Sequence, residues 1–288
     1  MQVKARLRAA ALAVPIAVIS ALAGAGGTAA HAAASGAPVY YLSLGDSLAQ
    51  GVQPNGSGQS VTTKQGYADD LYAVERFQVH GLRLEKLGCP GETTHTMIAG
   101  GICSYTSGSQ LGDAVSFLHT HNVAFVTIDI GANNVDGCVT PSGVNMTCIA
   151  AGIASAEADL PVILTTLRTA APDVPLFAMN YYDPFLAAWL QGPPGQALAT
   201  ESLTLAGDVN GLLQTVYGAF DVRVADVAGA FLTSDTSRIP FLNVPVNVFA
   251  ICSLTWMCAP SPVGPNIHAN AVGYGIIAAT FARTIGRL

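Results

Sequence analysis

A serine near the start of the chain stands where an apolar run ends, in the stretch GDSL that begins at Gly45. The run 39–44 (VYYLSL) predicts a strand, and the residues after Ser47 predict a helix, so Ser47 would occupy the first turn of that helix. The free N–H groups and the positive end of the helix dipole favour negative charge there. Ser47 could therefore be a nucleophile whose own N–H stabilises the oxyanion of acyl transfer. A helix-capping Asp or Ser without chemistry is the alternative.

Two residues after later apolar runs could donate further hydrogen bonds to an oxyanion. Asn133 follows the run 123–130, and its amide can stabilise a developing charge without being charged itself. Gly91 follows the run 82–87, and a glycine allows the backbone N–H to approach a substrate closely. Each has a simpler alternative, an asparagine-rich turn for the first and an ordinary loop glycine for the second.

His268 is the predicted general base. It lies in the stretch PNIHANAVGYG, after a proline-rich loop and at the start of the last predicted helix. His80, His119 and His121 precede strands and would lie at the opposite edge of a sheet, and His95 lies in a polar loop. Loops at the carboxyl ends of strands build the sites of such sheets, which favours His268 over a surface histidine.

Apolar strand-like runs alternate with longer helix-like segments along the chain. This rhythm predicts an α/β fold, a three-layer α/β/α sandwich with a central parallel sheet and one domain over residues 35–288. The five predicted strands are 39–44, 82–87, 123–130, 175–182 and 222–227, and the main predicted helices are 67–77, 150–169, 196–220 and 269–285.

Residues 1–34 have the features of a cleaved export signal. Lys4, Arg6 and Arg8 precede an apolar stretch, and Ala30-His31-Ala32 supplies a small-residue cleavage site. An uncleaved anchor is the alternative. No other apolar run approaches the ~20 residues that span a bilayer, so we expect a secreted, extracellular protein without stable membrane insertion.

The charge balance argues against nucleic acid as a partner. The predicted signal holds three of the 12 basic residues and none of the 18 acidic ones, so the remainder carries a formal charge of −9.

Six cysteines fall in three close pairs, and export makes disulfides the expected state. Six cysteines permit 15 connectivities, of which the three local loops are the simplest. No C-x-x-C knuckle or histidine at ligand spacing accompanies them, so no metal site is expected. The expected disulfides are Cys89–Cys103, Cys138–Cys148 and Cys252–Cys258.

With Ser47, Gly91, Asn133 and His268 in this order, the chain resembles the SGNH hydrolases, also called GDSL esterases and lipases. The resemblance spans the chain from GDSL to NIHANAVGYG and implies a flavodoxin-like sandwich. It also implies that Ser47 is the nucleophile and His268 the base, and that the Ser47 and Gly91 N–H groups and the Asn133 amide form the oxyanion hole. No cofactor is implied.

Two positions depart from the pattern of that family. Asn134 replaces an aspartate, which matters little if Asn133 is the donor, and Pro265 replaces the acid three residues before the histidine. The chain is similar to secreted actinobacterial members with three disulfides and a Ser-His dyad. That similarity implies that the main-chain carbonyl of Pro265 accepts the Nδ1–H of His268, with Asp226 or Asp235 as alternative acids.

The resemblance implies a serine esterase or lipase that acts as a monomer on lipid or fatty-acyl esters. A carbohydrate acetyl esterase and a non-catalytic exported binding protein on the same scaffold are the alternatives. Apolar residues on the predicted rim loops could line an acyl groove or simply pack the loops. These residues are Phe185, Trp189, Leu190, Phe249 and Trp256.

Overall fold

Five parallel strands form the central sheet in the computed structural model, which describes residues 38–288. All five strands predicted from the sequence are present, and the predicted parallel α/β fold is confirmed. Their spatial order is β4 (Leu82–Lys86), β1 (Val39–Gly45), β5 (Asn122–Asp129), β8 (Leu176–Met179) and β9 (Arg223–Ala225).

The strands in the middle of the sheet are buried on both faces, as their nearly continuous apolar sequences predict. In β1, Tyr41, Leu42 and Leu44 are fully buried, and in β5 Phe125 and Val126 are as well. Such strands leave only their ends accessible, so the site must be built from the loops that follow them.

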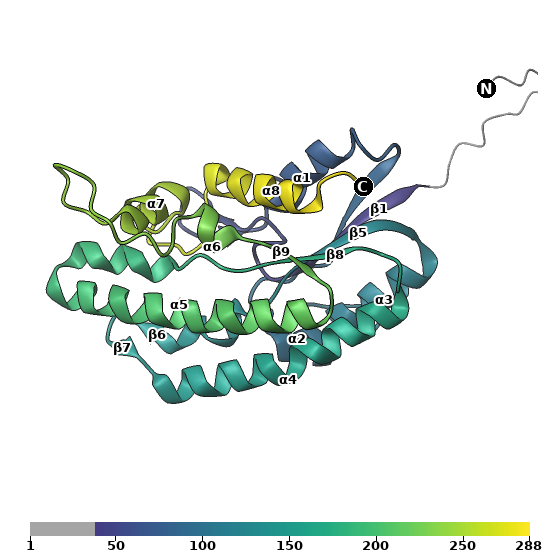
Figure 1. Ribbon diagram of the computed structural model, residues 1–288, viewed down its shortest axis with the longest axis horizontal. Coiled ribbons are helices and arrows are strands. Elements are labelled where there is room, and N and C mark those ends of the chain that lie inside the picture. Colours follow the sequence, from purple (N-terminus) through teal and green to yellow (C-terminus); the bar gives the residue numbers. More distant parts are fainter. Residues whose placement is uncertain (1–37) are drawn as a thin grey trace, which may run out of the picture. The chain divides into compact units, whose positions relative to one another are not determined.

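Helices cover both faces of the sheet (Figure 1). On one face, α1 (Tyr67–Glu75) packs on α8 (Ala271–Ile285), where the rings of Tyr67 and Phe281 stack 5.0 Å apart. On the other face lie α2 (Thr94–Ala99), α3 (Gln110–Thr120), α4 (Met146–Ala170) and α5 (Pro193–Ala219).

Shorter elements complete the described part of the chain, and the sequence patterns predicted none of them. The helical ones are η1 (Ala132–Asn134), η2 (Asp136–Cys138), η3 (Pro184–Gln191), α6 (Val227–Ala230) and α7 (Val246–Leu254). Two small antiparallel pairs are β2 (Gln53–Pro54) with β3 (Ser60–Val61), and β6 (Val139–Thr140) with β7 (Gly143–Val144).

Helix α4 corrects one expectation about apolar runs. Its 25 residues are long and apolar enough to cross a membrane by length and composition, which differs from the prediction that no such run follows the signal. In the structure, α4 packs against α2, α3 and α5, and a stripe that includes Leu160, Leu164 and Leu167 is fully buried.

The three predicted disulfides are confirmed, as Cys89–Cys103, Cys138–Cys148 and Cys252–Cys258. Each joins cysteines that are close in the sequence, at separations of 14, 10 and 6 residues. The predicted signal, residues 1–34, lies outside the described residues.

Candidate active site

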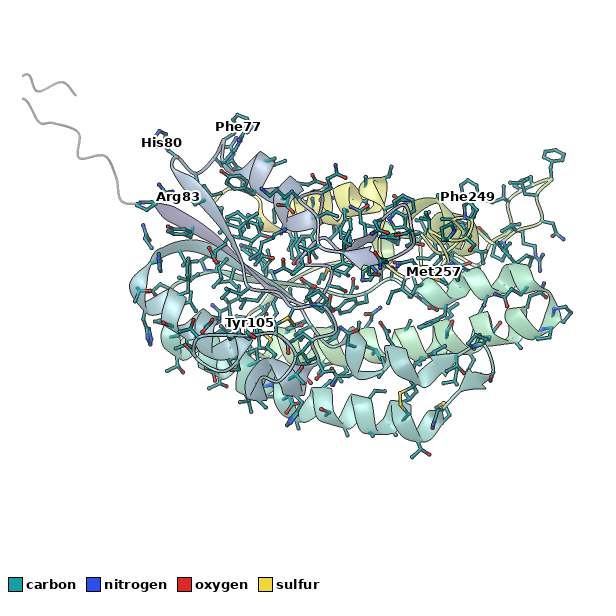
Figure 2. The ribbon with its side chains drawn as sticks, turned by 180° about the vertical axis from the view of Figure 1, so that it is seen from behind. Phe77, His80, Arg83, Tyr105, Phe249 and Met257 are labelled. Atoms are coloured by element: carbon teal, nitrogen blue, oxygen red, sulfur yellow. A yellow bond between two sulfur atoms is a disulfide. The ribbon has the colours of Figure 1, made fainter. Side chains whose placement is uncertain are left out.

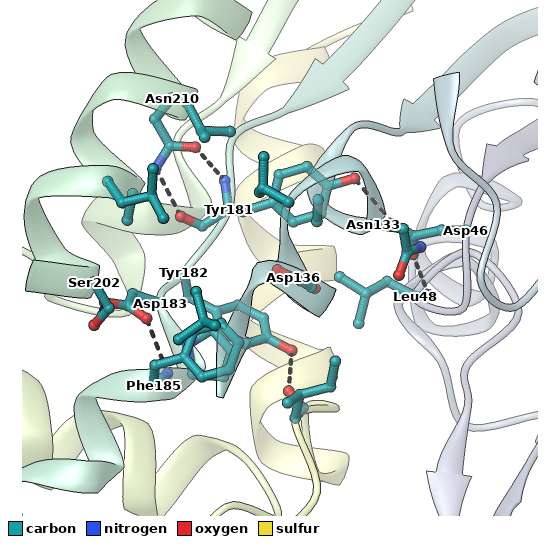
Figure 3. A pocket seen from close by; sticks show the side chains of 18 of the residues that line it. Asp46, Leu48, Asn133, Asp136, Tyr181, Tyr182, Asp183, Phe185, Ser202 and Asn210 are labelled. Atoms are coloured by element: carbon teal, nitrogen blue, oxygen red, sulfur yellow. Dashed lines mark hydrogen bonds between the residues drawn. The ribbon is translucent and has the colours of Figure 1, made fainter. Parts of the chain in front are cut away.

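A cavity opens at the carboxyl ends of the strands, and Ser47, Asn133 and His268 all line it. Figure 3 shows Asn133 among the side chains around this cavity. Ser47 follows the end of β1, Asn133 follows β5, and His268 precedes α8. Figure 2 shows His80 at the opposite end of the described part from Phe249 and Met257. The cavity holds about 740 Å³ of space, its open mouth included. Three of the four predicted residues therefore meet in one place.

A tight turn presents Ser47, and only glycine fits at its start. Gly45 has φ +133°, and a Cβ there would lie 2.2 Å from the carbonyl oxygen of Asp129. The carboxylate of Asp46 accepts hydrogen bonds from the Leu48 N–H at 2.9 Å and from the Tyr181 hydroxyl at 3.2 Å. The Ser47 N–H makes no hydrogen bond within residues 38–288 and is available to an oxyanion.

The prediction of a helix directly after Ser47 is wrong. Residues 46–51 form turns, closed by hydrogen bonds from the Gly51 N–H to the Leu48 carbonyl and from the Val52 N–H to the Ser47 carbonyl. A helix dipole therefore does not act on Ser47, and an oxyanion there would depend on individual donors.

A second buried carboxyl group, Asp129 at the end of β5, supports this turn. Its Oδ2 accepts hydrogen bonds from the Asp46 N–H at 3.3 Å and the Ala49 N–H at 3.2 Å, and its Oδ1 accepts one from the Tyr67 hydroxyl. Burial, and then the neighbouring Asp46, raise the pKa of Asp129 well above its usual range. Both groups are fully or nearly fully buried, so the pair resists full ionisation and fixes the turn by hydrogen bonds.

Gln110 ties the serine turn to the loop that carries Gly91. Its Oε1 accepts from the Gly45 N–H at 2.6 Å, and its Nε2 donates to the Gly45 carbonyl at 2.9 Å and to the Glu92 carboxylate at 3.1 Å. No motif marks Gln110, because its role depends on a contact across 65 residues.

Two of the predicted oxyanion donors, Gly91 and Asn133, are close to Glu92: Gly91 precedes it in the sequence, and Asn133 bonds to its carbonyl. One N–H of the Asn133 amide donates to the Glu92 carbonyl at 2.9 Å, which orients the side chain and leaves its second N–H free. Gly91, at φ +84°, is not among the residues lining the cavity, but its N–H makes no hydrogen bond within the described chain. The neighbouring Asn134 has a different contact: its Oδ1 accepts a hydrogen bond from the Thr94 N–H at 3.0 Å.

The group that orients His268 differs from the one expected. Nδ1 of His268 lies 2.7 Å from Oδ1 of Asn266, so the side chain of Asn266, rather than the carbonyl of Pro265, is its partner. The same Oδ1 accepts a hydrogen bond from the backbone N–H of His268 at 3.1 Å. This Asx turn holds the side-chain amide of Asn266 next to Nδ1 of the ring. The Asn266 Nδ2 donates to the Ser60 hydroxyl at 3.1 Å, which fixes which end of the amide faces the ring.

This contact selects the tautomer that a general base requires. With its proton on Nδ1, the ring leaves Nε2 free to accept one. Neither alternative acid bonds to His268: Asp226 caps α6 and accepts from Asn180 at 2.7 Å, and Asp235 accepts from Ser237 at 2.6 Å. Burial without a facing carboxylate lowers the pKa of His268 to about 4.

Asn266→Asp is expected to move the acid limb of kcat/KM upward. His268 must be neutral to accept a proton, so activity falls as pH falls through its pKa, which lies at about 4 in the wild type. A carboxylate at this position favours imidazolium and should raise the pKa by about 1–3 units. The measurement is a pH profile on a soluble ester, with Asp226→Asn and Asp235→Asn as controls that leave the limb in place. An unmoved limb in Asn266→Asp would contradict the assignment.

The hydroxyl of Ser47 and the ring of His268 line the same cavity but are not hydrogen-bonded within the described residues. Catalytic hydrogen bonds often tighten only when substrate binds. Tyr182 restrains the approach of the ring, because its hydroxyl donates to the Ile267 carbonyl at 2.9 Å.

The cavity wall is largely apolar, but most of it was not predicted. Of the five rim candidates only Phe185 lines the cavity; Trp256 donates to Gln53, and Trp189 lies under Arg238. Helix α5 supplies much of the wall, through Leu205, Ala206 and Val209. Residues 38–288 contain no cluster of three or more His, Cys, Asp or Glu that could hold a metal ion.

Comparisons with known proteins agree with this architecture. The model of the GDSL-like lipase/acylhydrolase family matches residues 43–276. An extracellular lipase from Streptomyces rimosus is similar in structure (19% identity, 85% of this chain, 99% of that chain, TM-score 0.55). A phospholipase A1 from Streptomyces albidoflavus NA297 is also similar (18% identity, 86% and 100% covered, TM-score 0.53). At these identities the likeness concerns the fold. The comparison with curated proteins gave no match.

Proposed function

This chain belongs to the GDSL-like lipase/acylhydrolase family, and on that premise we propose that it hydrolyses lipid or fatty-acyl esters through an acyl-enzyme on Ser47. The observation that carries the proposal is the meeting of Ser47, Asn133 and His268 in one cavity. Its apolar wall, and the lipase and phospholipase A1 named among the similar structures, favour fatty-acyl substrates.

The proposed reaction follows from the free donors and acceptors of the site. Nε2 of His268 takes the proton of the Ser47 hydroxyl as its oxygen attacks the ester carbonyl. The Ser47 N–H, the Gly91 N–H and the free N–H of Asn133 stabilise the oxyanion. His268 returns the proton to the leaving alcohol, and the sequence repeats with water, which releases the acid. Because Asn266 is uncharged, stabilisation of the imidazolium is weak and the oxyanion hole carries more of the catalysis.

Export to the extracellular space is part of the proposal. Three disulfides within the described residues and the extracellular Streptomyces lipase among the similar structures support it. A monomeric state and the absence of stable membrane insertion stay predictions.

Acyl-chain length separates the lipase proposal from an acetyl esterase. We expect kcat/KM for p-nitrophenyl octanoate to exceed that for the acetate by about tenfold or more, because each buried methylene contributes roughly 0.8 kcal/mol. Leu205→Ser, in the wall formed by α5, should reduce this preference and leave acetate hydrolysis nearly unchanged. A preference for acetate in the wild type would favour the acetyl esterase, and no turnover of either ester would favour the binding protein.

A further inference from the structure

One carboxyl group in the cavity wall has no partner. Asp136 is the first residue of η2, three positions after Asn133, and lines the same cavity as Ser47 and His268 (Figure 3). Its side chain makes no hydrogen bond within residues 38–288. Asp136 is half-buried, and because it lines the cavity, a bound molecule could be the partner of its carboxyl group.

The other two carboxyl groups of the cavity are already used by the fold. Asp46 accepts from the Leu48 N–H and the Tyr181 hydroxyl. Asp183 accepts from the Phe185 N–H at 2.9 Å and the Ser202 hydroxyl at 2.8 Å. Asp136 is therefore the carboxyl group of this wall whose two oxygens remain available to a ligand.

The ionisable groups that act most on Asp136 are two other carboxyl groups, Asp46 and Asp183. Among the described residues that line the cavity there is no lysine or arginine, and His268 is the one histidine. Burial first, and then Asp46 and Asp183, raise the pKa of Asp136 to about 8. With a pKa of about 8, the protonated group can donate to or accept from a substrate, and the deprotonated group is a carboxylate in a largely apolar wall.

We propose that Asp136 is a specificity-determining residue that forms a subsite for a cationic group of the ester, such as a quaternary ammonium on its alcohol. The inference rests on the proposed esterase function and narrows its substrate class. Attraction between a carboxylate and an organic cation grows as less water lies between them, and among the described residues no lysine or arginine lines the cavity to compete for Asp136.

Other groups that titrate face the same space. They are Asp46 after β1, Asp183 before η3, Tyr181 and Tyr182 after β8, and His268 before α8. Burial raises the pKa of Asp183 to about 6, below that of Asp136. In the proposed mechanism His268 acts in the same way on every ester. The effect of its titration therefore cancels when kcat/KM for one ester is divided by kcat/KM for another at the same pH.

The test compares two esters of the same acid that differ in one charge. Butyrylcholine carries a quaternary ammonium, and 3,3-dimethylbutyl butyrate has a carbon in place of the nitrogen. In the wild type, we expect the ratio of kcat/KM for the cationic over the neutral ester to rise about tenfold or more between pH 7 and 9.5. Asp136→Asn should hold this ratio flat over that range, and Asp173→Asn, which removes an exposed charge, should follow the wild type.

Each outcome of these measurements supports or overturns the proposed subsite. A flat ratio in the wild type, or the same rise in Asp136→Asn, overturns the subsite. If neither ester is cleaved, the proposed function fails, and the subsite is decided by calorimetry of choline and 3,3-dimethylbutanol at pH 9. Preferential binding of choline to the wild type and not to Asp136→Asn would support it, and equal binding of the two alcohols would overturn it.

Discussion

Replacing Ser47 with alanine is expected to lower kcat/KM for p-nitrophenyl butyrate by roughly 10⁶-fold, the loss that follows removal of a serine nucleophile. The substitution removes the atom that forms the acyl-enzyme in the proposed mechanism, and it should leave the turn intact. The turn is held by bonds to Gly45, Asp46 and Leu48, none of which uses the Ser47 side chain. The measurement is steady-state hydrolysis, with the thermal unfolding midpoint confirming the fold.

Ser43 provides a matched control for this variant. It lies four residues earlier in β1, is fully buried, and its hydroxyl has no partner within the described residues. Ser43→Ala should therefore leave kcat/KM within a few-fold of the wild type. A fluorophosphonate should phosphonylate Ser47 in the wild type and in Ser43→Ala, with loss of HF, and mass spectrometry should locate the adduct. Activity of Ser47→Ala close to that of the wild type, or an adduct on another residue, would remove Ser47 from the mechanism.

Asn133→Ala should lower kcat about 10²–10³-fold, as loss of one oxyanion donor does elsewhere. The amide donates to a charge that exists only in the transition state and the tetrahedral intermediate, so KM should change little. The effect should be at the upper end of that range, because Asn266 gives the imidazolium no compensating negative charge.

The neighbouring Asn134 separates catalysis from loop structure. Its amide donates to the Thr94 hydroxyl at 2.8 Å, and it does not line the cavity. Asn134→Ala should lower the unfolding midpoint and reduce kcat by less than tenfold. Equal losses of kcat in the two variants would mean that Asn133 acts through the loop and not on the oxyanion.

The sequence predicts the parts of this fold that depend on local patterns. Runs such as 123–130 are apolar because both faces of β5 are buried, so they identify the strands directly. Ser47, Asn133 and His268 follow from their places at strand and loop ends and from the order of the motifs. Short segments such as η3 and α7 carry too few residues for a period to be recognised.

Some residues of the site could not be predicted from the sequence, because they act through contacts that no local sequence pattern indicates. Asn266 reaches the ring of His268 because of an Asx turn, whereas the expected carbonyl of Pro265 was placed by analogy of position. Gln110 and Asp129 bond to the serine turn across 65 and 80 residues, and Tyr67 supports it through Asp129, which lies 62 residues away in the sequence. The wall from α5 likewise follows from packing and not from any pattern around Ser47.

None of the three disulfides joins one strand of the sheet to another, and the widest separation is 14 residues. Short closed loops remove less freedom from an unfolded chain than long ones do, and the five strands are joined to one another by backbone pairing and not by these bridges. The bridge from Cys252 to Cys258 instead braces the segment that leads to His268. Reduction of this bridge is therefore expected to lower the proposed activity by loosening the segment that carries His268, before the sheet itself unfolds.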